Sequence, residues 1–183
     1  SNSLIYDGFS KSATLQGDVL LINGKEKLFT NTLYFDLVTD IATYRDTALM
    51  TSESAKLSSL KGRYNLNKKI AYFYQDVIVI DSSFTLLTDT LYYDVESNMA
   101  EFFGPSFISQ EQTQIYAEGG YYNTKSGDAF FEKNAKYNSE SGRATSDVMR
   151  YSSTDKIIIL EGNAVVRDSS YTAVGDRIEY LQN

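Results

Sequence analysis

The sequence predicts an all-β fold built from about six copies of a 29-residue unit, each of which supplies two strands. Three observations predict it. An aromatic residue recurs every 29 residues, apolar and polar residues alternate with a period of two, and turn-forming residues separate the alternating stretches. No stretch keeps the i, i+3, i+4, i+7 pattern of an amphipathic helix.

The aromatic residue sets the frame of the repeat. Stepping by 29 from Tyr6 meets an aromatic side chain seven times, without insertion or deletion. At the chain's aromatic frequency of 14%, seven matches in one frame would arise by chance about once in a million. Three apolar columns keep the same step. The four columns are Tyr6, Phe35, Tyr64, Tyr93, Tyr122, Tyr151 and Tyr180; Ala13, Ala42, Ala71, Ala100, Ala129 and Ile158; Leu15, Tyr44, Phe73, Phe102, Phe131 and Leu160; and Leu28, Leu57, Leu86, Ile115, Ala144 and Ala173. We therefore expect residues 1–183 to form one repeat domain.

Each unit contains two strands of about ten to twelve residues. Alternation places one set of side chains on the same face in two successive units: Ala100, Phe102, Gly104, Ser106 and Ile108, then Ala129, Phe131, Lys133, Ala135 and Tyr137. Glycines stand inside several strands, at positions 62, 104, 119, 120 and 162. Because glycine inside a strand commonly marks a bulge or a sharp bend, we expect the strands to fold over themselves.

Two architectures fit this pattern. One is an antiparallel meander of bent strands, which forms two facing sheets that meet like a V. The other is a parallel β-helix with one 29-residue coil per turn. Turn-rich segments at both ends of each strand, such as 94–98 and 110–113, favour the meander, since hairpins need them.

A polar column follows the aromatic column and invites a calcium or catalytic interpretation. It consists of Asp7, Asp36, Asn65, Asp94, Asn123 and Ser152, with Leu181 at the seventh position. Neither metal binding nor acid–base chemistry tolerates the exchange of Asp for Asn, whereas Asx turns accept both. No calcium-binding loop motif is present. We interpret the column as turns, and we expect no metal site and no cofactor.

Composition excludes several classes of protein. The chain has no cysteine and no histidine, which removes disulfides, thiolate metal sites, and mechanisms that use a thiol or an imidazole. The candidate acidic pairs for a polysaccharide-processing enzyme, Asp76 with Asp81 and Asp147 with Asp176, fit turn or rim positions better, so we expect no catalytic residue. The net charge of −7 and the absence of a basic stripe argue against nucleic-acid binding. No apolar run is long enough for a spanning helix, and no signal-peptide core is recognisable.

The apolar columns allow two interpretations. Large side chains such as Phe102 alternate with small ones such as Ala100, and this alternation can fill a core or leave a continuous channel. A filled interior would suit a structural or adhesin-like β-solenoid without a lipid ligand. A channel would suit a long apolar guest, because every unit repeats the same contact.

Several segments resemble the OstA/LptA family of periplasmic lipopolysaccharide-transport proteins. The segment 161–168, Glu-Gly-Asn-Ala-Val-Val-Arg-Asp, matches the family pattern best, and weaker matches lie at 16–21 and 75–81. The unit at 86–94 and 98–104 recurs at 144–151 and 157–168. The unbroken spacing of 29 and the many tyrosines are most similar to OstA-like proteins of Bacteroidetes-type bacteria. The chain departs from the pattern at positions 62, 63, 119 and 120, where Gly and Arg replace the expected Leu and Tyr.

The resemblance implies an open-ended β-jellyroll (β-taco) whose apolar groove shields the acyl chains of lipopolysaccharide (lipid A) during periplasmic transport to the outer membrane. It implies no enzymatic activity, and like-folded partners similar to LptC and to the N-terminal domain of LptD. The ligand-binding residues that we expect in the groove are Leu15, Tyr44, Phe73, Phe102, Phe131 and Leu160, with Leu86, Leu91 and Ile115 from the partner strand. Neither terminal segment reads as a polar cap, which predicts head-to-tail self-association or association with a like-folded partner.

Overall fold

The computed structural model describes residues 1–52 and 55–181, and it contains only strands and turns there. The strands are β1 (Ser3–Asp7), β2 (Ser12–Asn23), β3 (Glu26–Asp36), β4 (Ile41–Tyr44), β5 (Ala48–Thr51), β6 (Ala55–Ser59), β7 (Lys61–Asn65), β8 (Ile70–Asp81), β9 (Thr85–Asp94), β10 (Met99–Gln110), β11 (Thr113–Asn123), β12 (Ala129–Asn138), β13 (Gly142–Ser152), β14 (Ile157–Asp168) and β15 (Thr172–Leu181). Within these described ranges, no helix could cross a membrane.

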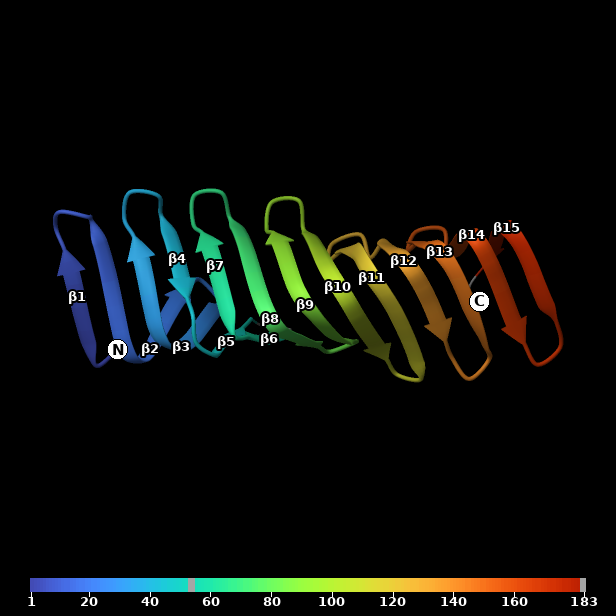
Figure 1. Cartoon of the computed structure of the whole chain (residues 1–183), viewed down its shortest axis with the longest axis horizontal. Coiled ribbons are helices and arrows are strands. Elements are labelled where there is room, and N and C mark those ends of the chain that lie inside the picture. The colour runs from blue at the N-terminus through green and yellow to red at the C-terminus, as the bar shows by residue number, and fades with distance from the viewer. Residues whose placement is uncertain (53–54, 182–183) are drawn as a thin grey trace.

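All fifteen strands belong to one antiparallel sheet. The paired order is β1-β2-β3-β4-β7-β8 and then strand by strand to β15, while β5 pairs with β3 and β6, and β6 pairs with β8. Figure 1 shows the strands side by side along the long axis, with β1 at one end and β15 at the other. The antiparallel ladders confirm the all-β meander and do not fit a parallel β-helix.

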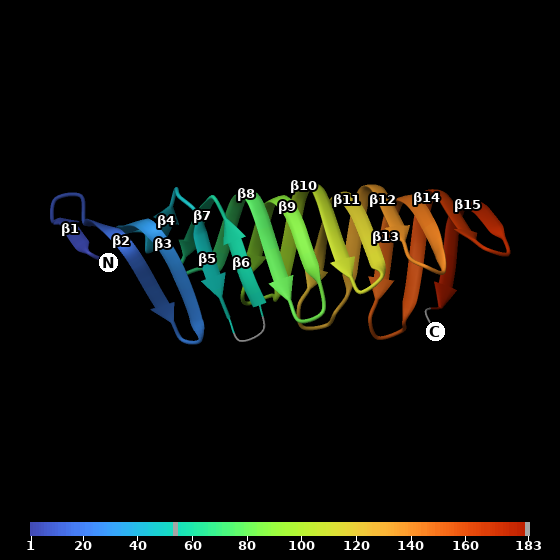
Figure 2. The ribbon, with the colours of Figure 1, turned by 90° about the horizontal axis from the view of Figure 1, so that it is seen from below.

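The sheet is folded over along a line that crosses the middle of the long strands. The ladder register shifts at this line in β2, β8, β10, β12 and β14, at positions that differ by multiples of 29 residues. Residues there take positive φ, among them Gly104 at 85° and Gly162 at 73°. We call the part that contains β1, β4 and β7 half-sheet A, and the part that contains β5 and β6 half-sheet B. Figure 2 shows the two halves as facing layers. The bend predicted from Gly104 and Gly162 is confirmed.

A column of small side chains fills the inside of the bend. Its members are Val19, Ala48, Val77, Ser106, Ala135 and Ala164, and each is at most 2% exposed. Two hydroxyls satisfy one another there, since the Oγ of Ser106 lies 2.8 Å from the Oγ1 of Thr88. Larger side chains would force the two halves apart, and this explains why the column stays small.

Two of the predicted long strands are interrupted. Residues 45–47 interrupt the first one, between β4 and β5, and Leu60 interrupts the second, between β6 and β7. Asp46 lies in the first break, where its carboxylate accepts a hydrogen bond from the Thr30 hydroxyl at 2.5 Å. The prediction that Lys133 lies on the same face as Phe131 and Ala135 is wrong. Lys133 sits at the bend with φ of 60° and pairs with Glu132 in solvent, so it does not face the interior.

The turns at the edge of half-sheet A have the expected Asx geometry. The Oδ1 of Asp36 accepts the N–H of Val38 at 2.8 Å, and the Oδ1 of Asn123 accepts the N–H of Lys125 at 3.0 Å. The same turns contain a second column, in which the residue is left-handed in every unit: Lys11, Asp40, Lys69, Asn98, Gly127 and Lys156. The polar column therefore closes turns, as its mixture of Asp, Asn and Ser indicates.

Candidate functional site

An open groove of about 900 Å³ lies between the two half-sheets. It runs from Glu26 on β3 to Ile158 on β14, so that it crosses most of the length of the sheet. Apolar and aromatic side chains from both halves line it, and polar side chains stand mainly at its rims. This volume lies within the roughly 300–1,000 Å³ that is typical of ligand pockets.

The structure brings most of the predicted groove residues together. The residues that line the groove are Phe73, Phe102, Phe131, Leu86, Leu91 and Ile115. The other three lie elsewhere. Tyr44 lines a smaller neighbouring pocket, whereas Leu15 and Leu160 line neither space. Leu160 is 0% exposed and Leu15 packs against the core near the N-terminal end, so both contribute to packing.

Two further columns line the groove and were absent from the predicted site. They are the aromatic residues Tyr64, Tyr93, Tyr122 and Tyr151, and the small residues Ala71, Ala100 and Ala129. Each aromatic residue is only partly buried and lies closer to the turn edge than the phenylalanine column does. The 29-residue spacing identified these columns, but spacing alone does not give the depth of each one.

The phenylalanine column forms the floor of the groove. Phe102 is 2% exposed, and its ring lies 6.0 Å from the ring of Phe131 across the intervening β11. That close approach requires a gap on β11. Gly120 supplies it, because a Cβ at this position would lie 2.6 Å from the Cζ of Phe102. The interior is therefore both core and groove, filled near the bend and open toward the rims.

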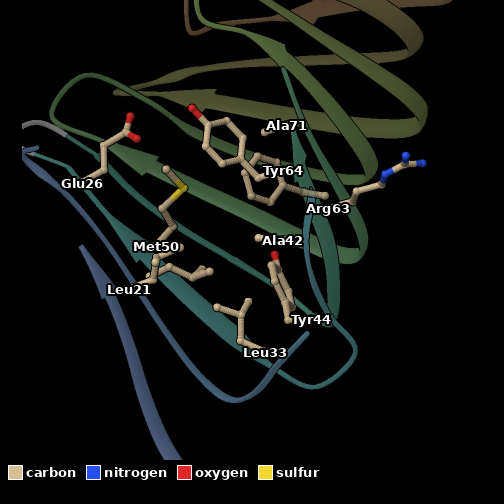
Figure 3. A pocket seen from close by; sticks show the side chains of 11 residues that line it. Leu21, Glu26, Leu33, Ala42, Tyr44, Met50, Arg63, Tyr64 and Ala71 are labelled. Carbon is tan, nitrogen blue, oxygen red and sulfur yellow. The ribbon is translucent and has the colours of Figure 1, made fainter. Parts of the chain in front are cut away.

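A smaller pocket of about 50 Å³ adjoins the N-terminal end of the groove. In Figure 3, Met50 from β5 and Tyr64 from β7 point toward one another, while Arg63 points away from the pocket. Glu26, Met50, Tyr64, Ala71 and Phe73 line both spaces. The two spaces therefore adjoin and share part of their lining.

Burial alters the ionisation of the polar groups at this end. It raises the pKa of the Glu26 carboxyl and, together with the charge of Glu26, the pKa of the Tyr64 hydroxyl. Burial also raises the pKa of Tyr44 to about 12, although the hydrogen bond with Ser59 at 2.6 Å opposes the shift. Each shift favours the neutral form, which costs less to keep beside apolar surface.

The acidic side chains in the described part of the chain do not form a metal-binding cluster. Among residues 1–52 and 55–181, no group of three or more acidic side chains could hold a metal ion. Of the acidic pairs considered from the sequence, Asp147 accepts a hydrogen bond from the Nδ2 of Asn163 at 2.9 Å, and Asp81 accepts the N–H of Ser83 at 3.1 Å in a hairpin turn. Both carboxylates have local structural roles.

Comparisons with known proteins agree with this geometry. A family model described as OstA-like protein matches residues 1–86, and one described as LptA/(LptD N-terminal domain) LPS transport protein matches residues 56–183. Among solved structures, the chain is similar to the crystal structure of LptH, the LptA homologous periplasmic component of the conserved lipopolysaccharide transport device from Pseudomonas aeruginosa. The identity is 15% and the TM-score 0.51, over 70% of this chain and 95% of LptH, which supports the fold. No curated protein matches the sequence.

Proposed function

Because the chain belongs to the family of LptA and LptD N-terminal domain lipopolysaccharide transport proteins, we propose that it is a non-enzymatic periplasmic carrier or bridge that holds lipopolysaccharide by its acyl chains in the groove. The observation that carries this proposal is the continuous apolar groove between the half-sheets. The adhesin-like alternative needs a filled interior, and a groove of about 900 Å³ speaks against it.

The energetics suit an amphiphile with several acyl chains. Each Å² of apolar surface removed from water contributes about 25 cal/mol, so long chains bind without any help from charge. This matters because the protein carries a net charge of −7 and does not attract anionic phosphates overall. The long open side of the groove leaves room for the sugars of the lipid to stay in water while the chains are shielded.

The ends of the sheet suit the assembly of a longer path. Among the described residues, β1 pairs only with β2 and β15 only with β14, which leaves an outer edge on each that can pair with another strand. We propose that these edges associate head-to-tail, with a second copy or with a like-folded transport protein. Such a contact is heterologous and can extend the groove from one protein to the next.

Filling the groove from within tests the lipid-binding proposal. Ala100→Trp and Ala129→Trp place large rings where small side chains line the groove, while leaving the buried floor intact. Thr90→Trp is the matched control, because Thr90 lies on the outer face of the same half-sheet. Native mass spectrometry with purified lipid A should show lipid bound to the wild type and to the control, and little bound to the double variant. Equal binding by all three proteins would overturn the proposal.

A further inference from the structure

The outer face of half-sheet A carries a row of mostly aromatic side chains on the side opposite the groove. Cross-strand pairing links the row strand by strand, and its order is Arg63, Tyr72, Tyr92, Glu101, Tyr121, Phe130 and Arg150. The row is thus two pairs of aromatic residues separated by one glutamate and flanked by two arginines. None of its members except Arg63 lines either space described above.

The rings of the row form two contacting pairs. The ring of Tyr72 lies 5.0 Å from that of Tyr92, tilted by 55°, and it also stacks on Tyr74 of its own strand at 6.0 Å and 3°. The ring of Tyr121 lies 5.2 Å from that of Phe130 at 19°, and the guanidinium of Arg150 lies 4.7 Å from the centre of the Phe130 ring. Tyr72 is 36% exposed, so solvent reaches its ring. Neighbouring members follow one another at the strand spacing of about 4.8 Å.

The outer face of half-sheet B differs in chemistry. Its equivalent row contains the aliphatic residues Leu20, Leu49, Ile78 and Leu87 together with Phe29, Phe107 and Tyr116, so it has one tyrosine where the row on half-sheet A has three. Strand propensity acts alike on both outer faces, so it does not explain why tyrosine gathers on half-sheet A. Aliphatic surface suits protein or acyl chains. Tyrosine rings interleaved with a carboxylate and guanidinium groups suit a ligand that is both flat and hydroxylated, since rings cover its C–H faces and the charged groups bond its hydroxyls.

The row also lies beside the place where a groove-bound lipid would leave the groove. Tyr72 stands two residues after the start of β8 at Ile70, and Tyr92 stands two residues before the end of β9 at Asp94. Each is therefore only about 7 Å along its strand from the turn edge of half-sheet A. A saccharide attached to acyl chains in the groove can pass over this edge and reach the row without crossing the bend.

We propose that this outer aromatic face binds the saccharide chain of the lipid whose acyl chains occupy the groove. The rings stack on sugar rings, Glu101 accepts hydrogen bonds from hydroxyls, and Arg63 and Arg150 bind phosphate or carboxylate groups on the saccharide. The inference rests on the proposed function, and it adds a second site on the opposite side of the same half-sheet.

Tyrosine NMR separates the two sites, because tyrosines occupy both. In protein with ¹³C-labelled tyrosine rings, lipid A without further sugars should shift the signals of the groove tyrosines, such as Tyr93 and Tyr122. The oligosaccharide released by mild acid from a rough-type lipopolysaccharide should shift Tyr72, Tyr92 and Tyr121 instead. If lipid A shifts no groove signal, the proposed function fails, while the saccharide sample still tests the outer face by itself.

Matched variants complete the test. Tyr92→Ala with Tyr121→Ala should weaken binding of the free oligosaccharide by about tenfold and leave lipid A affinity within about twofold. Leu87→Ala with Phe107→Ala, on the outer face of half-sheet B, should change neither affinity. The inference is overturned if the oligosaccharide moves no outer signal, if the tyrosine variant binds it as the wild type does, or if a chitin oligosaccharide shifts the same signals as strongly. A melting-temperature scan of each variant shows whether it is folded.

Discussion

The ring of Tyr44 on β4 occupies the place where a side chain of Gly62 on β7 would stand. The two residues pair in register, and a Cβ built on Gly62 would collide with the Tyr44 ring. Phe102 and Gly120 repeat the arrangement across β10 and β11. The residues 29 positions before and after Gly62 are Leu33 and Leu91, and both are buried. The space that a leucine fills in other units is thus filled at Gly62 by the ring of Tyr44 from the neighbouring strand.

This relationship predicts a pairwise rescue. Gly62→Leu alone should destabilise the fold by about 1–3 kcal/mol or more, because the new side chain overlaps the Tyr44 ring. In the double variant Gly62→Leu/Tyr44→Ala, the leucine takes the vacated space, and Ser59 keeps its hydrogen bond to the carbonyl of Lys61 at 3.1 Å. Urea unfolding of both single variants and the double variant measures the coupling. Strictly additive effects would show that the two residues do not share this space.

The same relationship shows what the sequence could and could not predict. The 29-residue columns predicted the units, and the turn-rich segments at both ends of each strand favoured the antiparallel meander, because repetition averages out local ambiguity. The family resemblance also marked Gly62 and Gly120 as departures, at positions where Leu or Tyr is expected, and the structure fills the space of the missing side chains from the neighbouring strand. Compensation by Tyr44 and Phe102 acts between neighbouring strands, so a pattern along the chain does not reveal it. The sequence pattern also does not show how deeply each member of a column is buried, for a similar reason. Leu160 and Phe102 share a column, yet only Phe102 reaches the groove.

A buried hydroxyl offers a stabilising substitution. The Oγ of Ser146 is buried without a hydrogen-bond partner among the described residues, and the residue 29 positions earlier is Ala117. Ser146→Ala should raise stability by about 1 kcal/mol, because it removes an unpaired polar group. Ser106→Ala is the contrasting control, since Ser106 bonds both Thr88 and the carbonyl of Gly104, and it should lower stability by a similar amount. Thermal unfolding of both variants measures the two opposite effects, and a loss of stability in Ser146→Ala would contradict the prediction.

The left-handed turn column predicts a second gain. Lys69 has φ of 53° at the position where another unit has Gly127 with φ of 81°. Lys69→Gly should raise the free energy of unfolding by about 0.5–1 kcal/mol through relief of this conformation. The lost ion pair with Glu96 at 3.3 Å is solvent-exposed and contributes little. Lys68→Gly, one residue earlier and without positive φ, should instead lower the melting temperature.

The Asx turns predict loss of stability in acid. Backbone N–H groups of Val38 and Ser97 hold the pKa of Asp36 and Asp94 below the usual 3.8. A lowered folded-state pKa means that the stabilisation is present above 3.8 and is lost as the pH falls through the lower folded value. The melting temperature should therefore fall between about pH 5 and pH 2. Asp36→Asn with Asp94→Asn keeps the accepting oxygens and should reduce this fall. An unchanged pH profile in the double variant would contradict the assignment.

Site-specific photo-crosslinking to lipid tests the central claim most directly. A photoreactive phenylalanine analogue at Ile115 or Tyr122 faces the groove, whereas the same group at Glu101 or Phe107 lies on an outer face. With lipid A that carries no further sugars, the account predicts crosslinks from Ile115 and Tyr122 and none from Glu101 and Phe107. Crosslinks from the outer positions alone would contradict the assignment of the groove as the acyl-chain site.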